Sequence, residues 1–238
     1  MSSLKELKSE LLKAANPEKA IGTAKYFQAK PGGYGEGDLF HGISVPHQRK
    51  IAKKYFQTID FSDILQLLCS DFHEERLTAI FILVYKFEKS KSDLEIKKIV
   101  EAYLEHTDFI NNWDLVDSSA HKIIGPYYED KPRTKLFELA HSKNLWEQRI
   151  AVISTFYFIK KDDFSDALKM AKELLHHKHD LMHKAIGWML REIGNRNLQV
   201  LLQFLNEHYL DMPRTMLRYA IEKFEEGLRQ DYLKGKIA

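Results

Sequence analysis

Cysteine, proline and glycine are all scarce in this sequence. The single Cys69 excludes an internal disulfide and a multi-cysteine zinc site, so we expect a reducing, intracellular compartment. With only 6 prolines and 11 glycines among 238 residues, few positions interrupt regular structure. No window approaches the roughly 20 apolar residues of a membrane span, and the N-terminus lacks the apolar core of a signal peptide. We therefore expect a cytoplasmic protein without a membrane partner.

An excess of charge of one sign is also absent. Lys and Arg number 36 against 34 Asp and Glu, a net charge of +2, so overall charge does not indicate a nucleic-acid partner. Any basic surface must be local, with the acidic residues elsewhere. The hydrophobic content of 44% is enough to form a core without metals or cross-links.

The residues that are present indicate an all-α fold. Apolar residues recur three and four positions apart nearly throughout, which predicts about a dozen short helices. Helix starts are predicted at Asn16–Pro17 and at Asn144 with Glu147, and helix ends at Gly125–Pro126 and Gly194–Asn195.

Three segments resemble one another: HEERLTAIFILVYKF, LWEQRIAVISTFYFI and LMHKAIGWMLREIG. When Arg76, Arg149 and Lys184 are aligned, the separations correspond to two repeats and one repeat of roughly 35 to 45 residues, as in helical solenoids. Trp113 lies about where the second helix of the intervening repeat should begin. Equivalent positions of stacked repeats line a common concave surface, so we expect Trp113 there.

The segment AKPGGYGEGDLFHGISVP, residues 29 to 46, interrupts the helical pattern. No strand precedes its glycines and no Gly-Lys-Ser/Thr follows them, so a phosphate-binding loop is not indicated. We expect a mobile, glycine-rich surface loop that could touch a ligand.

One predicted helix, from about Asn112 to Gly125, carries two acids of different character. Asp114 lies in the first turn, where the helix dipole favours a carboxylate, so a structural role is expected for it. Asp117 gains little from the dipole and shares a face with Trp113, four residues before it. It is either paired with a neighbouring Lys or Arg or part of a site.

Two further helices carry charged or aromatic residues in unusual places. Arg149 precedes ten uncharged residues in a helix that should be buried, so it needs an anionic partner. Asp114, Asp117 or an external phosphate could supply it. In the third repeated segment, Lys184, Trp188 and Arg191 lie opposite an apolar stripe that is formed by Met182, Ile186, Met189 and Ile193. Trp188 therefore either packs against a neighbouring repeat or stacks on a nucleic acid.

Four histidines, His176, His177, His179 and His183, lie close together in the sequence. Asp180 stands where zinc peptidases have Glu and no third ligand is indicated, so we predict no metal site. Basic, solvated histidines near an anionic ligand are expected instead. Cys69, in an apolar stretch, is expected in the core.

Four blocks follow one another over nearly the whole chain: NPEKA with Tyr26, WDLVDS from Trp113, WEQRIAV and KAIGWMLRE. In these blocks, their order and their similar spacing, the chain resembles the AlkD-type DNA alkylation repair glycosylases. The resemblance implies a single domain over residues 1–238, a superhelical solenoid of HEAT-like antiparallel helix pairs that binds duplex DNA as a monomer. It also implies excision of N3- and N7-alkylated purines without metal or cofactor, and without insertion of the base into a deep pocket.

The resemblance also implies roles for individual residues. Asp117 would be the catalytic acid, and Trp113 and Trp188 would hold the sugar and phosphate of the damaged nucleotide. Tyr26 would contact the phosphate backbone, and Arg149 and Arg191 would contact DNA or order the site, with Lys184 as a further DNA contact beside them. The sequence departs from some relatives at Asn112, where they have a second aromatic residue, and in its longer glycine-rich loop.

Three functions therefore compete. The first is an alkylpurine DNA glycosylase, and the second is a HEAT-like protein that binds damaged or branched DNA without chemistry. The third, a protein-interaction solenoid, accounts for the fold but leaves the cations around Trp188 unexplained.

Overall fold

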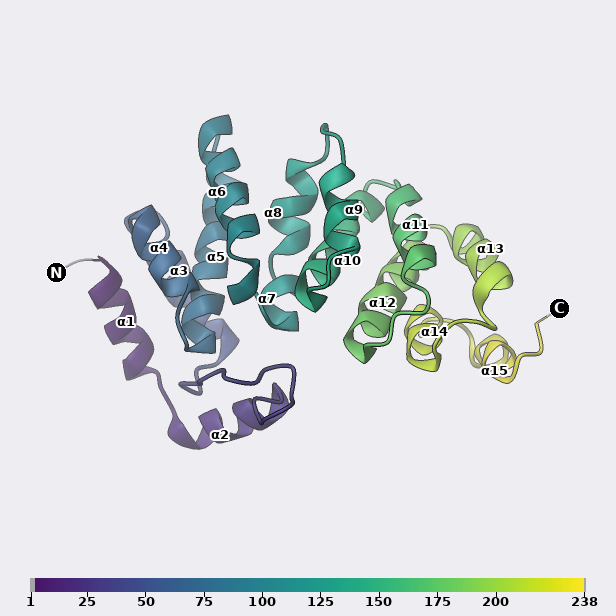
Figure 1. The fold of residues 1–238 in the computed structure, drawn as a ribbon, viewed down its shortest axis with the longest axis horizontal. Coiled ribbons are helices and arrows are strands. Elements are labelled where there is room, and N and C mark those ends of the chain that lie inside the picture. The colour runs from purple at the N-terminus through teal and green to yellow at the C-terminus, as the bar shows by residue number, and fades with distance from the viewer. Residues whose placement is uncertain (1–2, 238) are drawn as a thin grey trace. The chain divides into compact units, whose positions relative to one another are not determined.

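The computed structural model describes residues 3–237 and is all-helical, as the apolar spacing predicts. The described residues form fifteen α-helices and one 3-10 helix without any strand (Figure 1). The chain divides into two compact units, residues 1–123 and 124–238, and the boundary falls within one helix. None of the helices between residues 3 and 237 combines the length and apolar character that crossing a bilayer requires.

The first unit is built around a long buried helix, α5, which packs against α3, α4, α6 and α7. Its residues from His73 to Val84 are buried on every side of the helix, which is why the segment shows no amphipathic stripe. The elements of this unit are α1 (Ser3–Lys13), α2 (Pro17–Tyr26), α3 (Val45–Tyr55), α4 (Phe61–Leu68), α5 (His73–Lys89), α6 (Asp93–Glu105), η1 (Thr107–Phe109) and α7 (Trp113–Asp117).

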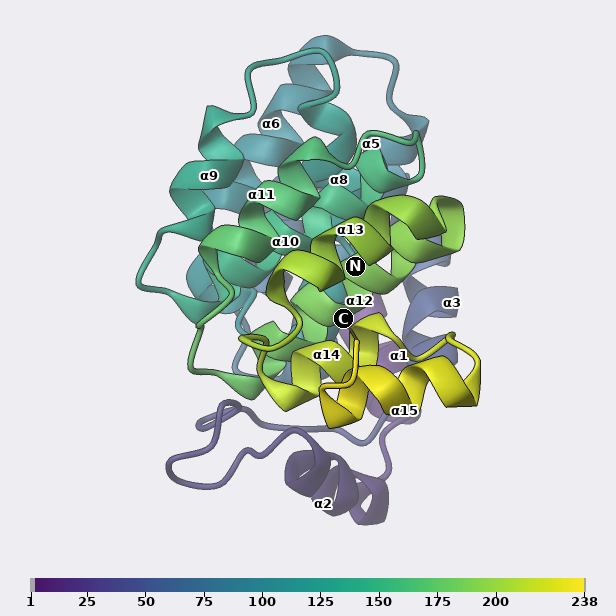
Figure 2. The same cartoon turned by 90° about the vertical axis from the view of Figure 1, so that its right-hand side faces the viewer.

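Within this unit, α2 differs from the other helices because it buries none of its residues. Figures 1 and 2 show α2 and the loop after it crossing one end of the stacked helices. The Asn16 side chain accepts a hydrogen bond from the Lys19 N–H, and Pro17 occupies the first helical position, so the predicted start is confirmed.

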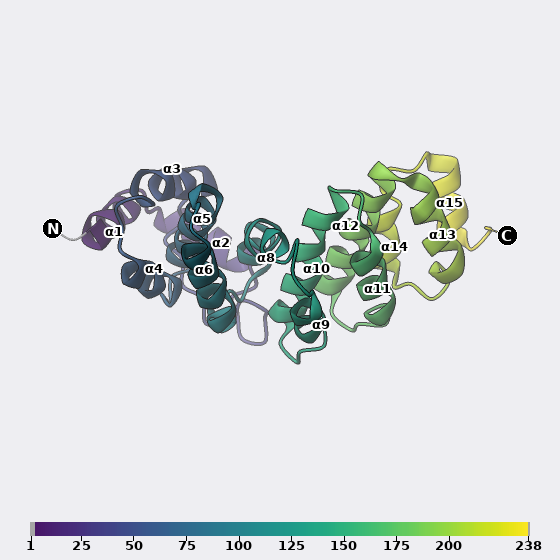
Figure 3. The same ribbon diagram turned by 90° about the horizontal axis from the view of Figure 1, so that it is seen from above.

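The second unit consists of helices that pack in sequence order. Helices α10, α12 and α14 pack side by side, and α9, α11 and α13 pack against them (Figure 3). The elements are α8 (Ala120–Tyr127), which contains the boundary, α9 (Thr134–Ala140), α10 (Leu145–Ile159), α11 (Ser165–Glu173), α12 (Asp180–Arg196), α13 (Leu198–His208), α14 (Arg214–Ala220) and α15 (Glu226–Lys234).

The prediction of one helix from Asn112 to Gly125 is wrong, because the segment forms two helices. Helix α7 ends at Asp117 and α8 begins at Ala120. Between them, the buried Ser119 hydroxyl donates to the Leu115 carbonyl and also bonds the Tyr103 hydroxyl. Serine side chains that bond nearby backbone groups compete with helix continuation, which accounts for the break.

Gly125 and Pro126 were also expected to end a helix, yet both lie inside α8. A Cβ atom at Gly125 would lie 2.5 Å from Cβ of Tyr157 and 2.7 Å from the Ser154 carbonyl oxygen. Gly125 therefore permits close packing of α8 on α10. The second predicted stop, Gly194–Asn195, is nearly right, because α12 ends at Arg196.

Candidate functional site

Helix α7 is only five residues long, so contacts outside the helix set its position. The Asn112 side chain accepts a hydrogen bond from the Trp113 N–H at 2.9 Å and caps its start. Trp113 and Asp117, its first and last residues, are both half-buried. The short helix thus holds the aromatic residue and the acid of the predicted site at its two ends.

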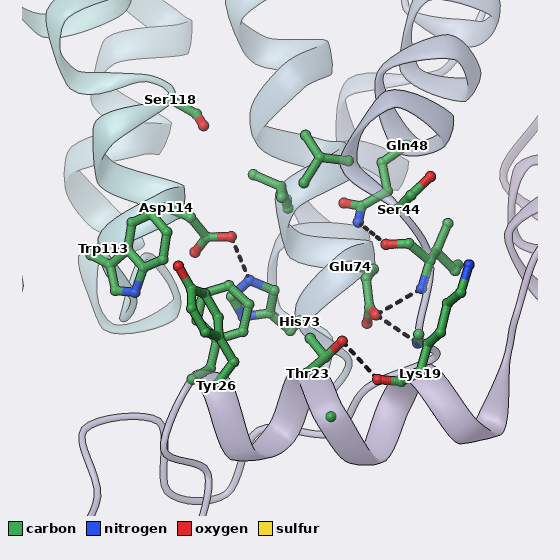
Figure 4. A pocket seen from close by; sticks show the side chains of 16 residues that line it. Lys19, Thr23, Tyr26, Ser44, Gln48, His73, Glu74, Trp113, Asp114 and Ser118 are labelled. Atoms are coloured by element: carbon green, nitrogen blue, oxygen red, sulfur yellow. Dashed lines mark hydrogen bonds and ion pairs between the residues drawn. The ribbon is translucent and has the colours of Figure 1, made fainter.

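A cavity of about 680 Å³ lies beside α7 in the first unit. Figure 4 shows Trp113 and Asp114 of α7 on one side, Gln48 of α3 on the other and Tyr26 of α2 between them. The lining also includes Lys19, Gly22, Thr23, Phe27, Gly42, Ile43, Ser44, Val45, His73, Glu74, Leu77 and Ser118. Ser118, next to Asp117, belongs to this lining, and Asp117 does not.

A buried charged network fixes the position of α7. His73, 1% exposed, contacts Asp38 through Nδ1 at 3.1 Å and Asp114 through Nε2 at 2.9 Å. Arg76 donates to the other Asp38 oxygen at 2.7 Å and to the Asn111 side chain at 3.1 Å. Two acids thus meet two bases, and the network links the glycine-rich loop, α5 and α7.

The two acids raise the pKa of His73. Burial acts to lower this pKa, but the hydrogen bonds to Asp114 and Asp38 outweigh it and bring the value to about 9. The pKa of Asp38 is lowered, because the bonds and charges of His73 and Arg76 outweigh its burial. At neutral pH, His73 is therefore an imidazolium between carboxylates.

This raised pKa predicts how stability depends on pH. Below His73's usual pKa of 6.5, the folded and unfolded chains are both protonated, so its contribution to the unfolding free energy is fully present. The contribution is lost as pH rises through the folded value of about 9. We expect a loss of about 3 kcal/mol in wild type relative to His73→Gln. Urea unfolding of both proteins at several pH values between 6 and 10 measures this loss. Parallel plots of unfolding free energy against pH would contradict a raised pKa for His73.

Asp114 has a larger role than helix-start stabilisation. Its Oδ1 accepts the Leu115 N–H at 2.9 Å, as expected of a first-turn acid. Its Oδ2 contacts His73, which the sequence prediction missed. Asp114 is therefore both a helix-start residue and a buried ion-pair partner that lines the cavity.

Tyr26 ends α2 beside Trp113. Its ring is in edge contact with Trp113, at 6.0 Å between centroids and 74° between planes. The side chain is 66% exposed. It therefore presents a phenol to solvent at the cavity.

The glycine-rich loop lies at the surface over residues 30 to 34, as its composition predicted, but its second half is fixed by buried contacts. The buried Glu74 carboxylate accepts the N–H groups of His41, Gly42 and Ile43. Gly42 has φ +77°, and a Cβ there would lie 2.1 Å from the Asn16 carbonyl oxygen, so glycine is required. The second half of the loop is thus held by buried acids of α5 and by the Asp38 contacts.

In the second unit, the two faces predicted for α12 are confirmed. All four residues of the apolar stripe are buried, whereas Lys184, Trp188 and Arg191 are half-buried. The Trp188 indole N–H donates to Glu192 at 2.9 Å, and its ring packs on Phe156 at 5.5 Å. Trp188 therefore packs against a neighbouring helix within this unit.

The cations near Trp188 have acidic neighbours. Arg191 contacts Glu222 and Glu192, and Lys184 lies 2.8 Å from Asp180. Arg149 is 4% exposed, and its guanidinium donates to the Leu181 carbonyl, a backbone partner that the sequence did not predict. The local positive charge is thus balanced in part by nearby carboxylates.

Comparison with known proteins identifies the family. The model of the DNA alkylation repair enzyme family matches residues 7–224. The chain belongs to this family. A solved structure described as a predicted DNA alkylation repair enzyme from Enterococcus faecalis has a TM-score of 0.67 and 20% identity, covering 89% of this chain and 97% of that one. At this identity the likeness shows the fold alone, and the search of curated proteins gave no match.

Membership of the DNA alkylation repair family gives DNA as the expected substrate and a repair enzyme as the expected activity. Family membership alone does not assign hydrolysis of the glycosidic bond or the roles of individual residues. These finer assignments remain proposals.

The histidine cluster has a structural role in this family member. His179 caps α12 by accepting the Leu181 N–H, and His177 bonds Gln148 at 2.9 Å. Burial lowers the pKa of both His177 and His179, so they are neutral at pH 7, contrary to the expected basic character. Within residues 3–237, no group of three or more possible metal ligands comes together.

Several residues around the cavity were not predicted from the sequence. His73 and Glu74 begin the HEER segment, which the sequence marks only as part of a repeat. An available signal was the polar first turn of a helix that is otherwise apolar on all sides, because such a turn is buried with the rest and needs partners. Cys69 was expected in the core but is half-buried at the end of α4, where burial raises the pKa of its thiol.

Proposed function

We propose that this protein is a monofunctional DNA glycosylase that excises cationic N3- and N7-alkylated purines from duplex DNA. The observation that carries the proposal is the pairing of Trp113 and Asp117 at the two ends of α7, a helix held by a buried charged network. Membership of the DNA alkylation repair family supports it. No metal or cofactor enters the proposed reaction.

The chemistry needs few groups. An N7-alkylguanine or N3-alkyladenine is already positively charged, so cleavage of its bond to deoxyribose releases a neutral base and leaves cationic character on the sugar. Asp117 would stabilise the oxocarbenium-like sugar and position the attacking water. The electron-rich faces of Trp113 and Trp188 would favour the same cationic sugar.

The proposal assigns DNA contacts to residues of both units. Tyr26 in the first unit and Lys184 and Arg191 in the second would contact the phosphate backbone, and Arg149 would contact DNA or order the site. The packing of successive helices within each unit supports a HEAT-like solenoid that acts as a monomer and a single DNA-binding domain.

A base-release assay tests this function. Purified protein incubated with duplex DNA that contains N7-methylguanine should release the free base, which chromatography quantifies. Release without added metal is expected and should persist in a chelator. No release from N7-methylguanine or N3-methyladenine substrates would exclude the proposed activity.

A second candidate is a protein that binds damaged or branched DNA without excision. The buried Asn112, which caps α7 where some relatives have an aromatic residue, favours it. It shares duplex binding with the first proposal and differs in releasing no base.

Lys184→Ala tests the DNA contact that both candidates need. Removal of one phosphate-contacting cation should weaken binding at all sequences and reduce the slope of log K against log salt by about 1. Fluorescence anisotropy over a salt series measures both quantities. Lys97→Ala is the control, since Lys97 is an exposed lysine that is likewise paired with an acid four residues away, Glu101. Equal slopes in the two variants would contradict the contact.

A further inference from the structure

Phe27, the residue that follows α2, packs on the indole of Trp113. The two ring centroids lie 5.4 Å apart with 31° between the planes, and Tyr26 contacts the same indole edge-on at 6.0 Å. The hydrogen bond between Trp113 and Asn112 uses the backbone N–H of Trp113 and does not restrain the indole, so the ring contacts orient it. Phe27 is 8% exposed, whereas Tyr26 is 66% exposed. Phe27 is therefore the buried support of Trp113.

Two further rings hold Phe27 in place. Its centroid lies 4.6 Å from that of His73, with 30° between the planes, and 5.7 Å from that of Phe40, with 7° between the planes. Phe40 also stacks on His73 at 5.1 Å. The imidazolium of His73 attracts the electron-rich faces of both phenyl rings. Phe27 thus connects the buried charged network, through His73, to Trp113.

The glycine-rich loop fixes the backbone of Phe27 from the other direction. A Cβ atom at Gly35 would lie 2.4 Å from the Phe27 carbonyl oxygen and 3.4 Å from the Asn112 side-chain nitrogen. The first distance is too short for any side chain, so glycine is required for the loop to lie this close. Asn112 caps the helix that Trp113 begins. The loop therefore packs on the residue that supports Trp113 and beside the residue that precedes it.

We propose that Phe27 is a positioning residue for Trp113, and that the glycine-rich loop keeps Phe27 in place. The effect on catalysis rests on the proposed function, in which the electron-rich face of Trp113 favours a cationic sugar. That attraction weakens when the ring tilts or moves away from the cation, so the support behind the indole affects the reaction. Because Phe27 is buried, it acts through Trp113 and not by contact with DNA.

Phe27→Leu tests this role, because leucine keeps much of the apolar bulk but has no ring to support the indole. Single-turnover release of N7-methylguanine should fall about 10- to 100-fold, the cost of displacing a positioned group in a reaction site. Duplex affinity should stay at the wild-type value, since no phosphate-binding cation is removed. Phe40→Leu is the matched control, since Phe40 also stacks on His73 but is not among the rings that contact Trp113. It should release base at close to the wild-type rate, and an equal loss of rate in the two variants would overturn the role.

A double-mutant cycle separates positioning from a general disturbance of the fold. If Phe27 acts through Trp113, Phe27→Leu should cost little further rate in a Trp113→Leu background, where no indole remains to be positioned. The same fold reduction of the rate in both backgrounds would contradict the role. Urea unfolding shows whether each variant is folded. Phe27→Met, which is closer to phenylalanine in volume and adapts to irregular gaps, repeats the cycle if leucine unfolds the protein.

Fluorescence distinguishes failure of this inference from failure of the proposed function. The chain contains three tryptophans, so the difference in emission between a protein and its Trp113→Leu variant isolates Trp113. Phe27→Leu should move this emission to longer wavelength and lower its anisotropy, because an unsupported indole is more exposed and more mobile, whereas Phe40→Leu should not. These changes in a protein that releases no base support the positioning role and overturn glycosylase activity. Unchanged Trp113 emission, or base release by Phe27→Leu at the wild-type rate, overturns the positioning role alone.

Discussion

Asp117→Asn should lower the rate of N7-methylguanine release by about 100- to 1,000-fold, the usual effect of removing one preorganised group that stabilises charge in a transition state. Asparagine keeps the size of the side chain but not its negative charge, so it cannot favour a cationic sugar. Duplex affinity should not fall, because no phosphate-binding cation is removed. Single-turnover base release, measured with enzyme in excess, isolates the chemical step.

Two other acids of the first unit serve as controls for this variant. Asp93→Asn changes an exposed acid at the start of α6 and should release base at the wild-type rate. Asp114→Asn weakens the contact to His73, so it should lower stability more than Asp117→Asn does. Release by Asp117→Asn at the rate of Asp93→Asn would remove Asp117 from the mechanism.

Asp38→Ala should destabilise the protein by about 3 to 5 kcal/mol, because it leaves buried cations without their partner. Asp38 accepts from Arg76 at 2.7 Å and contacts His73 at 3.1 Å, and all three side chains are buried. Its loss should also free the glycine-rich loop from α5. Urea unfolding gives the free energy, and limited proteolysis should show faster cleavage between residues 27 and 44.

Glu36→Ala is the matched control in the same loop. Glu36 is exposed and accepts only the Gly32 N–H among the hydrogen bonds described for it, so its removal should change stability by less than about 1 kcal/mol. If Asp38→Ala behaves like Glu36→Ala, the network does not stabilise the fold. The unfolding free energy of Asp38→Asn should lie between those of the two alanine variants, since asparagine can still form hydrogen bonds but carries no charge.

Local sequence signals predicted a helix well where neighbouring residues in the sequence cap the ends of that helix. Helix α10 begins after the capping Asn144, as predicted, and the two faces of α12 follow from spacing alone. The family was predicted from four short blocks and is confirmed by the match over residues 7–224. These features depend on residues that are close together in the sequence.

The cavity and its charged network could not be predicted in this way. Asp38, His73 and Asp114 come from three separate segments, and nothing within any one segment indicates the other two. The break between α7 and α8 likewise depends on Tyr103, which bonds Ser119 from another helix. The roles of Trp113, Asp117 and Trp188 remain predictions, which the base-release and variant assays address.

The network around His73 also bears on the order of folding. Its two bonds join residues 35 and 41 positions apart, so each forms only after a long segment has closed into a loop. Helices α1 and α3 to α6 are longer and form from local contacts, whereas the five residues of α7 are too few to form a stable helix alone. Trp113 and Asp117 should therefore be ordered late, and quenched-flow hydrogen exchange should show the amides of α7 protected after those of α5.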